Sequence, residues 1–431
     1  MKTDRMRERA AAADPRAAGG SRIPELDGLR VLMIFLVAAY HIWQQSWLTP
    51  VLGSYSLDYL LRSGYIWVDG TILLSSFLLF LPYARAARAG RPLPEPRDFY
   101  FRRVRRILPS YYFILLAVFF GIALPWRLYS SPQFMVKDLA AHLTFTFPFF
   151  DDTLLITPLG PASWTLAIEV QAYLLFPLLA RAALRRPGWT FAGMVLVGWG
   201  FRLWCIWALS NYNTVVNQLP NFLDVYALGM VLAAVYPRLR EQSLSRGGQV
   251  LRAIAATAVF ALAFWGLLRL LRFQAGASVY SASAGLGGKI AAWLGCADPD
   301  SNYVVIQRNQ MVYRPIFALC FGALILSAPW TLRPLRFLLG NPLARFLSGI
   351  SMNFYLIHQI LIVHMRRVGF PPSVSDVPNQ VGEQPWQTQY TLWAWGLSLL
   401  SAIAVTYLIE KPCARLLDRW RKKSAAGRQR R

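Results

Sequence analysis

Charged residues, cysteine and histidine are all scarce in this 431-residue chain. Asp, Glu, Lys and Arg together make up 15% of it, and there are four Cys and four His. No Cys pair has the spacing of a disulfide framework and no Cys–His spacing resembles a metal site, so we expect neither disulfides nor a bound metal. The chain is instead 55% hydrophobic, which is more than a soluble core requires. The composition excludes an ordinary soluble protein and indicates an integral membrane protein.

Apolar runs long enough to cross about 30 Å of hydrocarbon follow one another along the chain. They predict an all-α, polytopic membrane protein with about ten transmembrane helices and no separate soluble domain. The predicted spans are 31–48, 66–83, 107–124, 164–181, 189–209, 222–237, 251–271, 311–328, 343–365 and 390–410. We therefore expect a basic tail at 1–23, a membrane domain at 24–412 and a second basic tail at 413–431.

The connections between the spans alternate in charge. Lys and Arg crowd into every second connection and into both tails, whereas 49–65, 125–163 and 210–221 contain almost none. The positive-inside bias of membrane proteins then predicts that both termini are cytoplasmic. The pattern is less clean in the outer connections 272–310 and 366–389, which carry several basic residues.

The formal net charge of +24 would by itself fit a nucleic-acid-binding protein. Because the excess lies in short connections beside the spans, anionic lipid head groups explain it better, and we expect membrane lipids rather than nucleic acid as partners. The N-terminal region has no short apolar segment followed by a small-residue cleavage site, so we expect the first span to remain as an anchor. No internal repeat is evident, which argues against a transporter built from duplicated halves.

Two ionisable residues, Arg30 and His41, lie in the first predicted span or at its edge. About three helical turns separate them, so they share one stripe of the helix with an axial offset of ~16 Å. Groups at this depth usually face a protein interior or a wet cavity. Arg30 alone is also explained as a positive-inside anchor, and His41 as a satisfied buried imidazole. Their common register favours a functional site, and Asp27, three residues before Arg30, is placed to pair with it.

A second polar group precedes the third span. Arg103 and Arg106 are three residues apart, so they are neighbours on one helix face. Guanidinium groups bind phosphate through two parallel hydrogen bonds, so the pair predicts a docking site for a charged cytoplasmic ligand. A plain polybasic interface with lipid is equally compatible with this segment.

The segment that opens the fourth span contains Glu169 and Tyr173, four residues apart and therefore on one helix face. Neither side chain is suited to contact with lipid. Glu169 is placed to orient or charge His41, and a structural hydrogen bond between helices is the competing explanation.

The ninth span carries a polar face formed by Ser351, Tyr355 and His358, which are spaced four and three residues apart. This spacing favours cavity lining or hydrogen bonding between helices over direct catalysis. No nucleophile elbow, phosphate-binding Gly loop or zinc-protease helix is present in the sequence.

Taken in order, four segments resemble the acyltransferase-3 family of membrane O-acyltransferases, from about Pro24 to about Pro412. They are LDGLR followed by His, with ten residues between Arg30 and His41; the Arg103 and Arg106 pair before Pro109 and Tyr111; SWTLAIEVQAY, with Trp164, Glu169 and Tyr173; and ISMNFYLIH with the later IEKP.

The second span departs from the family pattern. The family often has a Phe-Phe pair and Ser-Gly-Phe there, whereas this chain has Thr71-Ile72 and Ser75-Ser76-Phe77. The replacement of that Gly by Ser76 leaves the close packing of this span unexplained. We also expect no hydrolase-like soluble domain after the tenth span, unlike the longer members of the family.

The resemblance implies an acyltransferase in the bacterial inner membrane. It would take an acyl group, usually acetyl, from cytoplasmic acyl-CoA and transfer it to a hydroxyl group of an extracytoplasmic or lipid-linked glycan or a secondary metabolite. We expect acceptor contacts from the outer connections 125–163 and 272–310, which are long enough to shape selectivity.

The expected reaction suggests a role for each of the polar residues singled out above. We expect Arg103 and Arg106, helped by Arg30, to hold the CoA phosphates while the thioester reaches His41, which would act as general base. Glu169 would fix the His41 tautomer or stabilise its imidazolium, and an acyl-His intermediate is the alternative chemistry. The side chains expected to line the substrate cavity are Asp27, Trp164, Tyr173, Ser351, Tyr355 and His358. A transporter or exporter of a sugar-like or anionic substrate is the alternative function, since buried charges also line translocation paths.

Overall fold

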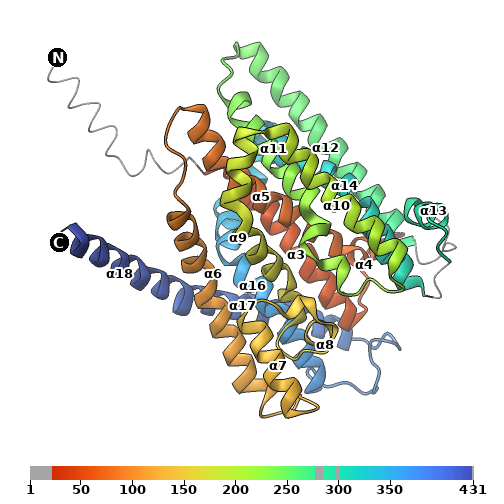
Figure 1. Ribbon diagram of the computed structural model, residues 1–431. Helices are drawn as coiled ribbons and strands as arrows, with labels where there is room; N and C mark the ends of the chain where they lie inside the picture. Colours follow the sequence, from red (N-terminus) through yellow and green to blue (C-terminus); the bar gives the residue numbers. More distant parts are fainter. Residues whose placement is uncertain (1–21, 277–284, 298–300, 430–431) are drawn as a thin grey trace, which may run out of the picture.

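The protein is a bundle of helices, seen here in a computed structural model that describes residues 22–276, 285–297 and 301–429 (Figure 1). Ten helices in these ranges are long and apolar enough to cross a membrane. The α-helical parts of these ten spans are α3 (Glu25–Ser46), α5 (Trp67–Arg88), α6 (Pro96–Val118), α9 (Trp164–Arg185), α10 (Pro187–Ala208), α11 (Leu223–Arg240), α12 (Arg246–Gly276), α14 (Asn302–Ser327), α16 (Pro342–Arg367) and α17 (Trp386–Val405). The predicted all-α fold with ten spans is confirmed.

Several helices are longer than the spans predicted from hydropathy. Helix α6 begins at Pro96, so its arginines are helical, and a π-helical turn, η2 (Phe119–Ala123), extends it at the other end. Helix α17 continues through a second π-helical turn, η8 (Thr406–Glu410), into α18 (Lys411–Gln429), which extends away from the bundle (Figure 1). Hydropathy marks only the part of a helix in hydrocarbon, whereas its backbone hydrogen bonds continue into the polar interface.

Short elements connect the spans. They are the antiparallel strands β1 (Val51–Leu52) and β2 (Tyr55–Ser56) and the helices α4 (Asp58–Arg62), α7 (Pro132–Leu143), α8 (Asp151–Leu155), α13 (Gly285–Trp293) and α15 (Arg333–Gly340). The predicted basic tail at 1–23 lies outside the described residues except for its last two positions. The predicted tail at 413–431 falls on α18 up to 429, and its last two positions lie outside the described residues.

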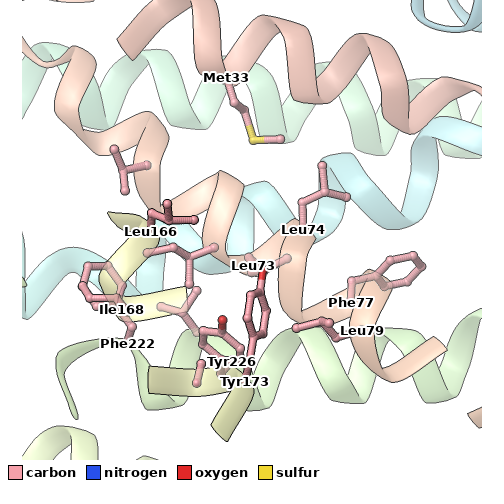
Figure 2. Packing of buried hydrophobic residues seen from close by; sticks show 14 of the residues in the cluster. Met33, Leu73, Leu74, Phe77, Leu79, Leu166, Ile168, Tyr173, Phe222 and Tyr226 are labelled. Atoms are coloured by element: carbon pink, nitrogen blue, oxygen red, sulfur yellow. The ribbon is translucent and has the colours of Figure 1, made fainter. Parts of the chain in front are cut away.

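The centre of the bundle is built around α5, which is the most deeply buried of the ten spans, whereas α12 is the least buried. Helix α5 packs mainly against α11, and α3 packs mainly against α16. Since lipid is as apolar as these side chains, close van der Waals packing rather than removal from water holds such helices together. Figure 2 shows part of this packing, with side chains of α5 among those of α9 and α11 and of the turn before α11, including Leu73, Phe77, Ile168, Phe222 and Tyr226.

A glycine on α11 permits the close approach of α5. A Cβ atom at Gly229 would lie 2.8 Å from both the backbone oxygen of Leu73 and the side chain of Ser76. The Ser76 hydroxyl also donates a 2.6 Å hydrogen bond to the backbone oxygen of Tyr226. The small residue missing from the second span is therefore supplied by its partner helix, because only glycine lets the two backbones come this close.

We expect Gly229→Ala to destabilise the protein by about 1–3 kcal/mol, because the added methyl group must push α11 away from Leu73 and Ser76. Thermal unfolding of the detergent-purified protein measures this as a lower Tm. Gly193→Ala on α10 is the matched control, since a Cβ there meets no atom within 4 Å. Equal Tm values for the two variants would contradict the packing role of Gly229.

Buried ion pairs fasten other helices together. Arg202 on α10 donates from its two terminal nitrogens to the carboxylate of Asp224 on α11, over 2.6 and 2.7 Å. Arg314 on α14 pairs with Asp69 on α5 at 3.2 Å. Both arginines are fully buried. A charge left alone in such a site would be very costly, so these pairs fix which helices are neighbours.

The segment between α6 and α9 forms a small lobe containing α7 and α8 at one end of the bundle (Figure 1). At its centre Asp138 accepts hydrogen bonds from Tyr129 and Thr157, at 2.9 and 2.8 Å, and pairs with the fully buried His142. Burial, and then the carboxyl group of Asp138, raise the pKa of Tyr129. His142 is therefore a structural residue.

Candidate active site

Three cavities follow one another through the bundle, and their walls contain ten of the eleven side chains singled out in the sequence. We name them the mouth cavity, of about 1080 Å³, the middle cavity, of about 180 Å³, and the distal cavity, of about 150 Å³. The eleventh side chain, His358, is buried directly behind the distal cavity, where it contacts His41.

The mouth cavity is strongly basic. Seven arginines line it, against the two acidic residues Asp27 and Glu410; the arginines are Arg22, Arg30, Arg85, Arg91, Arg102, Arg103 and Arg106. Two of their buried nitrogens, Nη2 of Arg85 and Nε of Arg103, make no hydrogen bond within the described part of the chain. Such a surplus of unpaired donors suits a ligand with several phosphate groups.

Asp27 has a structural role at this mouth. Its carboxylate accepts from Arg22 at 2.8 Å and from the Ser348 hydroxyl on α16 at 3.1 Å. Asp27 thus forms its ion pair with Arg22 instead of the predicted partner Arg30. This leaves the guanidinium group of Arg30 free of any hydrogen bond to the described residues and facing the cavity.

Arg30, Arg103 and Arg106 stand where the mouth cavity meets the middle cavity, because all three line both. They come from α3 and α6, and the three-residue spacing on α6 brings its two arginines to one face. The guanidinium group of Arg103 lies over the Phe99 and Tyr173 rings, 5.5 Å from each ring centre. The structure therefore brings together the three cations that the sequence grouped.

The middle cavity contains Glu169, whose carboxylate is held on both sides. Its two oxygens accept hydrogen bonds of 2.7 Å from the hydroxyl groups of Ser75 on α5 and Tyr173 on α9. Arg30 and Arg103 both lie within electrostatic range of it. Glu169 is not among the residues around the distal cavity and forms no hydrogen bond with His41, so the predicted contact between them is absent from the described structure.

The partner of His41 is another histidine. Nδ1 of His41 lies 2.8 Å from Nε2 of His358, and the two rings are stacked with their centres 5.1 Å apart. On its other side, Nδ1 of His358 lies 2.7 Å from the backbone oxygen of Tyr355. His358 was predicted to line the cavity, and its spacing on α16 gave no sign that it would meet α3.

This geometry fixes the tautomers of a neutral pair. A backbone oxygen only accepts, so Nδ1 of His358 must carry the proton and its Nε2 must be an acceptor. Nδ1 of His41 then donates to that acceptor, which leaves Nε2 of His41 as an unprotonated nitrogen. His41 lines the distal cavity. The arrangement presents a base to whatever occupies that cavity.

The distal cavity has aromatic and amide walls, and no Asp, Glu, Lys or Arg is among the described residues that line it. Its polar and aromatic lining consists of Tyr40, His41, Tyr65, Trp164, Asn217, Tyr303, Gln307, Gln310 and Tyr355. The predicted outer connection 272–310 contributes four of its lining residues, all from 303–310, whereas 125–163 contributes none to this cavity. The remaining part of 272–310 lies partly outside the described residues.

Two further predicted residues take their expected places. Trp164 lines the distal cavity, and Ser351 lines the middle cavity with its hydroxyl donating to the backbone oxygen of Ser348. His364 lies outside the three cavities, at the edge of the Trp126 ring. Among the described residues no group of three His, Cys, Asp or Glu side chains could hold a metal ion.

Sequence reasoning missed Ser75 and, in the distal cavity, the amides and every tyrosine except Tyr355. A hydroxyl such as that of Ser75 is common in membrane helices, so nothing in the local sequence marks it as a ligand of Glu169. Gln307 and Gln310 carried a usable signal, because they are three residues apart and therefore share a helix face in a connection that was predicted to contact the acceptor.

An arginine-lined mouth is thus joined to a pair of histidines by a chain of cavities. The sequence profile of the acyltransferase-3 family, described as an acyltransferase domain, matches residues 23–411. The chain belongs to this family.

The curated proteins that the chain resembles include two named O-acetyltransferase OatA. It is 27% identical over 168 residues to peptidoglycan O-acetyltransferase OatA of Listeria monocytogenes, covering 36% of this chain and 24% of that protein. It is 25% identical over 235 residues to O-acetyltransferase OatA of Staphylococcus aureus, covering 50% of this chain and 35% of that protein. The chain thus matches only about a quarter to a third of the length of these relatives. No solved structure gives a significant match.

Proposed function

We propose that this protein is an acyl-CoA-dependent O-acyltransferase that moves an acetyl group across the bundle to a hydroxyl group of a carbohydrate. The observation that carries the proposal is the line of cavities from the arginine-lined mouth to the free nitrogen of His41. The names of the relatives support acetyl as the group transferred.

The donor end fits coenzyme A. Its phosphates are multiply charged, and the mouth cavity offers seven arginines, two of which have buried nitrogens without a hydrogen bond in the described part of the chain. Its pantetheine arm is narrow and uncharged, as is much of the middle cavity beyond Arg30, with Ile34, Ile72, Leu74 and Leu166 on its walls. Glu169 acts here as a positioning residue, since its charge balances the arginines through which the arm must pass.

The acceptor end fits a neutral sugar. The C–H faces of a sugar ring pack against aromatic side chains, and its hydroxyl groups bond to amides, both of which surround the distal cavity. An acceptor with its own charge would be left without a counter-ion there, apart from the imidazole of His41.

The charge distribution supports one orientation. The basic mouth cavity adjoins the basic connection between α5 and α6, and the positive-inside bias favours the cytoplasmic side for it, where acyl-CoA is made. Both chain ends then lie in the cytoplasm of a bacterium, and the distal cavity lies toward the outer face of its inner membrane.

In the reaction, Nε2 of His41 removes the proton of the acceptor hydroxyl, and the oxygen attacks the thioester carbonyl carbon. The C–S bond then breaks, and the proton passes from His41 to the departing thiolate. In the alternative sequence His41 is acylated first. Acid quenching after mixing with labelled acetyl-CoA, without acceptor, distinguishes the two, because only an acyl-His intermediate leaves label on the protein.

The test is acetyl transfer by the purified protein in lipid vesicles, with acetyl-CoA and a neutral N-acetylhexosamine oligosaccharide. We expect free CoA thiol to appear together with an oligosaccharide heavier by one acetyl group. An exporter would instead move the oligosaccharide unmodified and without acetyl-CoA, and that result would refute the proposal.

Arg103→Ala is expected to raise the KM for acetyl-CoA about 10- to 100-fold, because a charge-assisted hydrogen bond contributes roughly 1.5–3 kcal/mol. The KM for the acceptor should stay unchanged, since Arg103 lines only the mouth and middle cavities among the three. Arg97→Ala is the matched control: it removes the same charge from the same helix at a residue outside all three cavities. If Arg103→Ala and Arg97→Ala raised the KM for acetyl-CoA equally, the positive charge of the region rather than a specific contact with Arg103 would explain donor binding.

A further inference from the structure

Tyr355 lies between the middle cavity and the distal cavity. It is the one residue that lines both the middle and the distal cavity in the described structure. A thioester that entered past Arg30 and a hydroxyl group held beside His41 would therefore meet at its side chain. The three cations lie on one side of Tyr355 and the imidazole base on the other.

The Tyr355 hydroxyl has only a weak polar neighbour. It is buried and lies near the Thr165 side chain, yet it makes no hydrogen bond of ordinary geometry to Thr165 or to any other described residue. Buried polar groups are almost always hydrogen-bonded, so a donor that lacks an ordinary hydrogen bond at a junction of two cavities indicates that a ligand completes it.

Tyr355 is also rigidly tied to the histidine pair. Its backbone oxygen accepts the 2.7 Å hydrogen bond from Nδ1 of His358, and its ring centre lies 5.5 Å from that of His358. The same residue thus fixes the tautomer of His358, and through it that of His41, and its hydroxyl is a donor in the cavity wall that His41 also lines. Donors held in place before the reaction are the most effective stabilisers of developing charge.

We propose that Tyr355 is a catalytic residue whose hydroxyl stabilises the oxyanion formed during acyl transfer. The inference rests on the proposed function. When the acceptor oxygen bonds to the thioester carbonyl carbon, the C=O electron pair moves onto the carbonyl oxygen, which accepts a hydrogen bond from Tyr355. As the C–S bond breaks, the carbonyl re-forms, CoA leaves as the thiolate, and the proton taken by His41 protonates the sulfur.

The ring has a second consequence. The ring lies between the middle and the distal cavity, so it limits the access of solvent from the distal cavity to a thioester bound in the middle cavity. Removing only the hydroxyl group and removing the whole ring should therefore have different effects.

The experiment compares Tyr355→Phe and Tyr355→Ala with the unmodified protein in lipid vesicles. For Tyr355→Phe we expect kcat to fall about 100-fold, with both KM values within about three-fold of the original. For Tyr355→Ala we expect, in addition, CoA release without acceptor, because water now reaches the thioester. Tyr226→Phe is the control: its hydroxyl is equally buried and unpartnered, but it lines none of the three cavities, so kcat should persist.

The outcomes separate the two proposals. An unchanged kcat in Tyr355→Phe would overturn the oxyanion role while leaving the acyltransferase intact. An equal fall in Tyr226→Phe would show that the loss reflects packing, and it would overturn the inference too. If the unmodified protein released no CoA with any acceptor, the proposed function itself would fail, and the inference with it.

Discussion

Replacing His41 with alanine is expected to lower kcat for acetyl transfer by about 1,000-fold. A positioned general base contributes roughly 10²- to 10⁴-fold, and His41 is the one imidazole among the described residues that line the distal cavity. The donor KM should change little, since the arginines of the mouth are untouched. The measurement is the steady-state rate of thiol release at saturating acetyl-CoA and acceptor.

His364→Ala is the matched control for His41→Ala, because it removes an imidazole from a spanning helix at a position outside the three cavities. Its kcat should match that of the unmodified protein. Both variants should also keep the original Tm. If His41→Ala retained more than about a tenth of the original rate with its fold intact, the assignment of His41 as the base would be wrong.

Replacing His358 with leucine should lower kcat nearly as much, about 100- to 1,000-fold, without removing any group that touches the substrates. Leucine cannot accept the proton of Nδ1 of His41, so the imidazole is free to shift that proton to Nε2 and thereby lose its base. A wrong tautomer is known to be a large defect in catalytic histidines.

His358→Gln distinguishes this tautomer effect from a simple packing defect. The amide oxygen of glutamine can accept the hydrogen bond from His41. The kcat of His358→Gln should therefore be at least about ten-fold higher than that of His358→Leu. A general loss of packing would leave the glutamine variant no better than the leucine variant. That result would show that His358 supports the fold alone.

The positions of the spans and of their polar residues were predictable because they depend on local sequence. A membrane requires each spanning helix to be apolar over its whole length, so hydropathy locates it regardless of its neighbours. For the same reason Arg30, His41 and Glu169 stood out, since ionisable groups in such helices nearly always line an interior. All three do line cavities of the site.

The contacts among those residues were not predictable. The sequence offered Glu169 as the partner of His41, and the structure gives Ser75 and Tyr173 as the partners of Glu169. Glu169 is on a helix that carries the right residue type, but this helix lines two different cavities within two turns, with Trp164 at the distal and Glu169 at the middle cavity. A displacement of five residues along α9 therefore decides which group the carboxylate can reach.

By itself, then, the sequence determined the membrane class, the ten spans, the family and the set of polar side chains that face inward. Only the tertiary structure decided that His41 meets His358, 317 positions further along the chain, and that one tyrosine stands between the arginines and the base. The physical reason is that hydropathy and helical periodicity act within a helix, whereas a hydrogen bond between helices depends on their packing, which small residues such as Gly229 and buried pairs such as Arg202 with Asp224 set together.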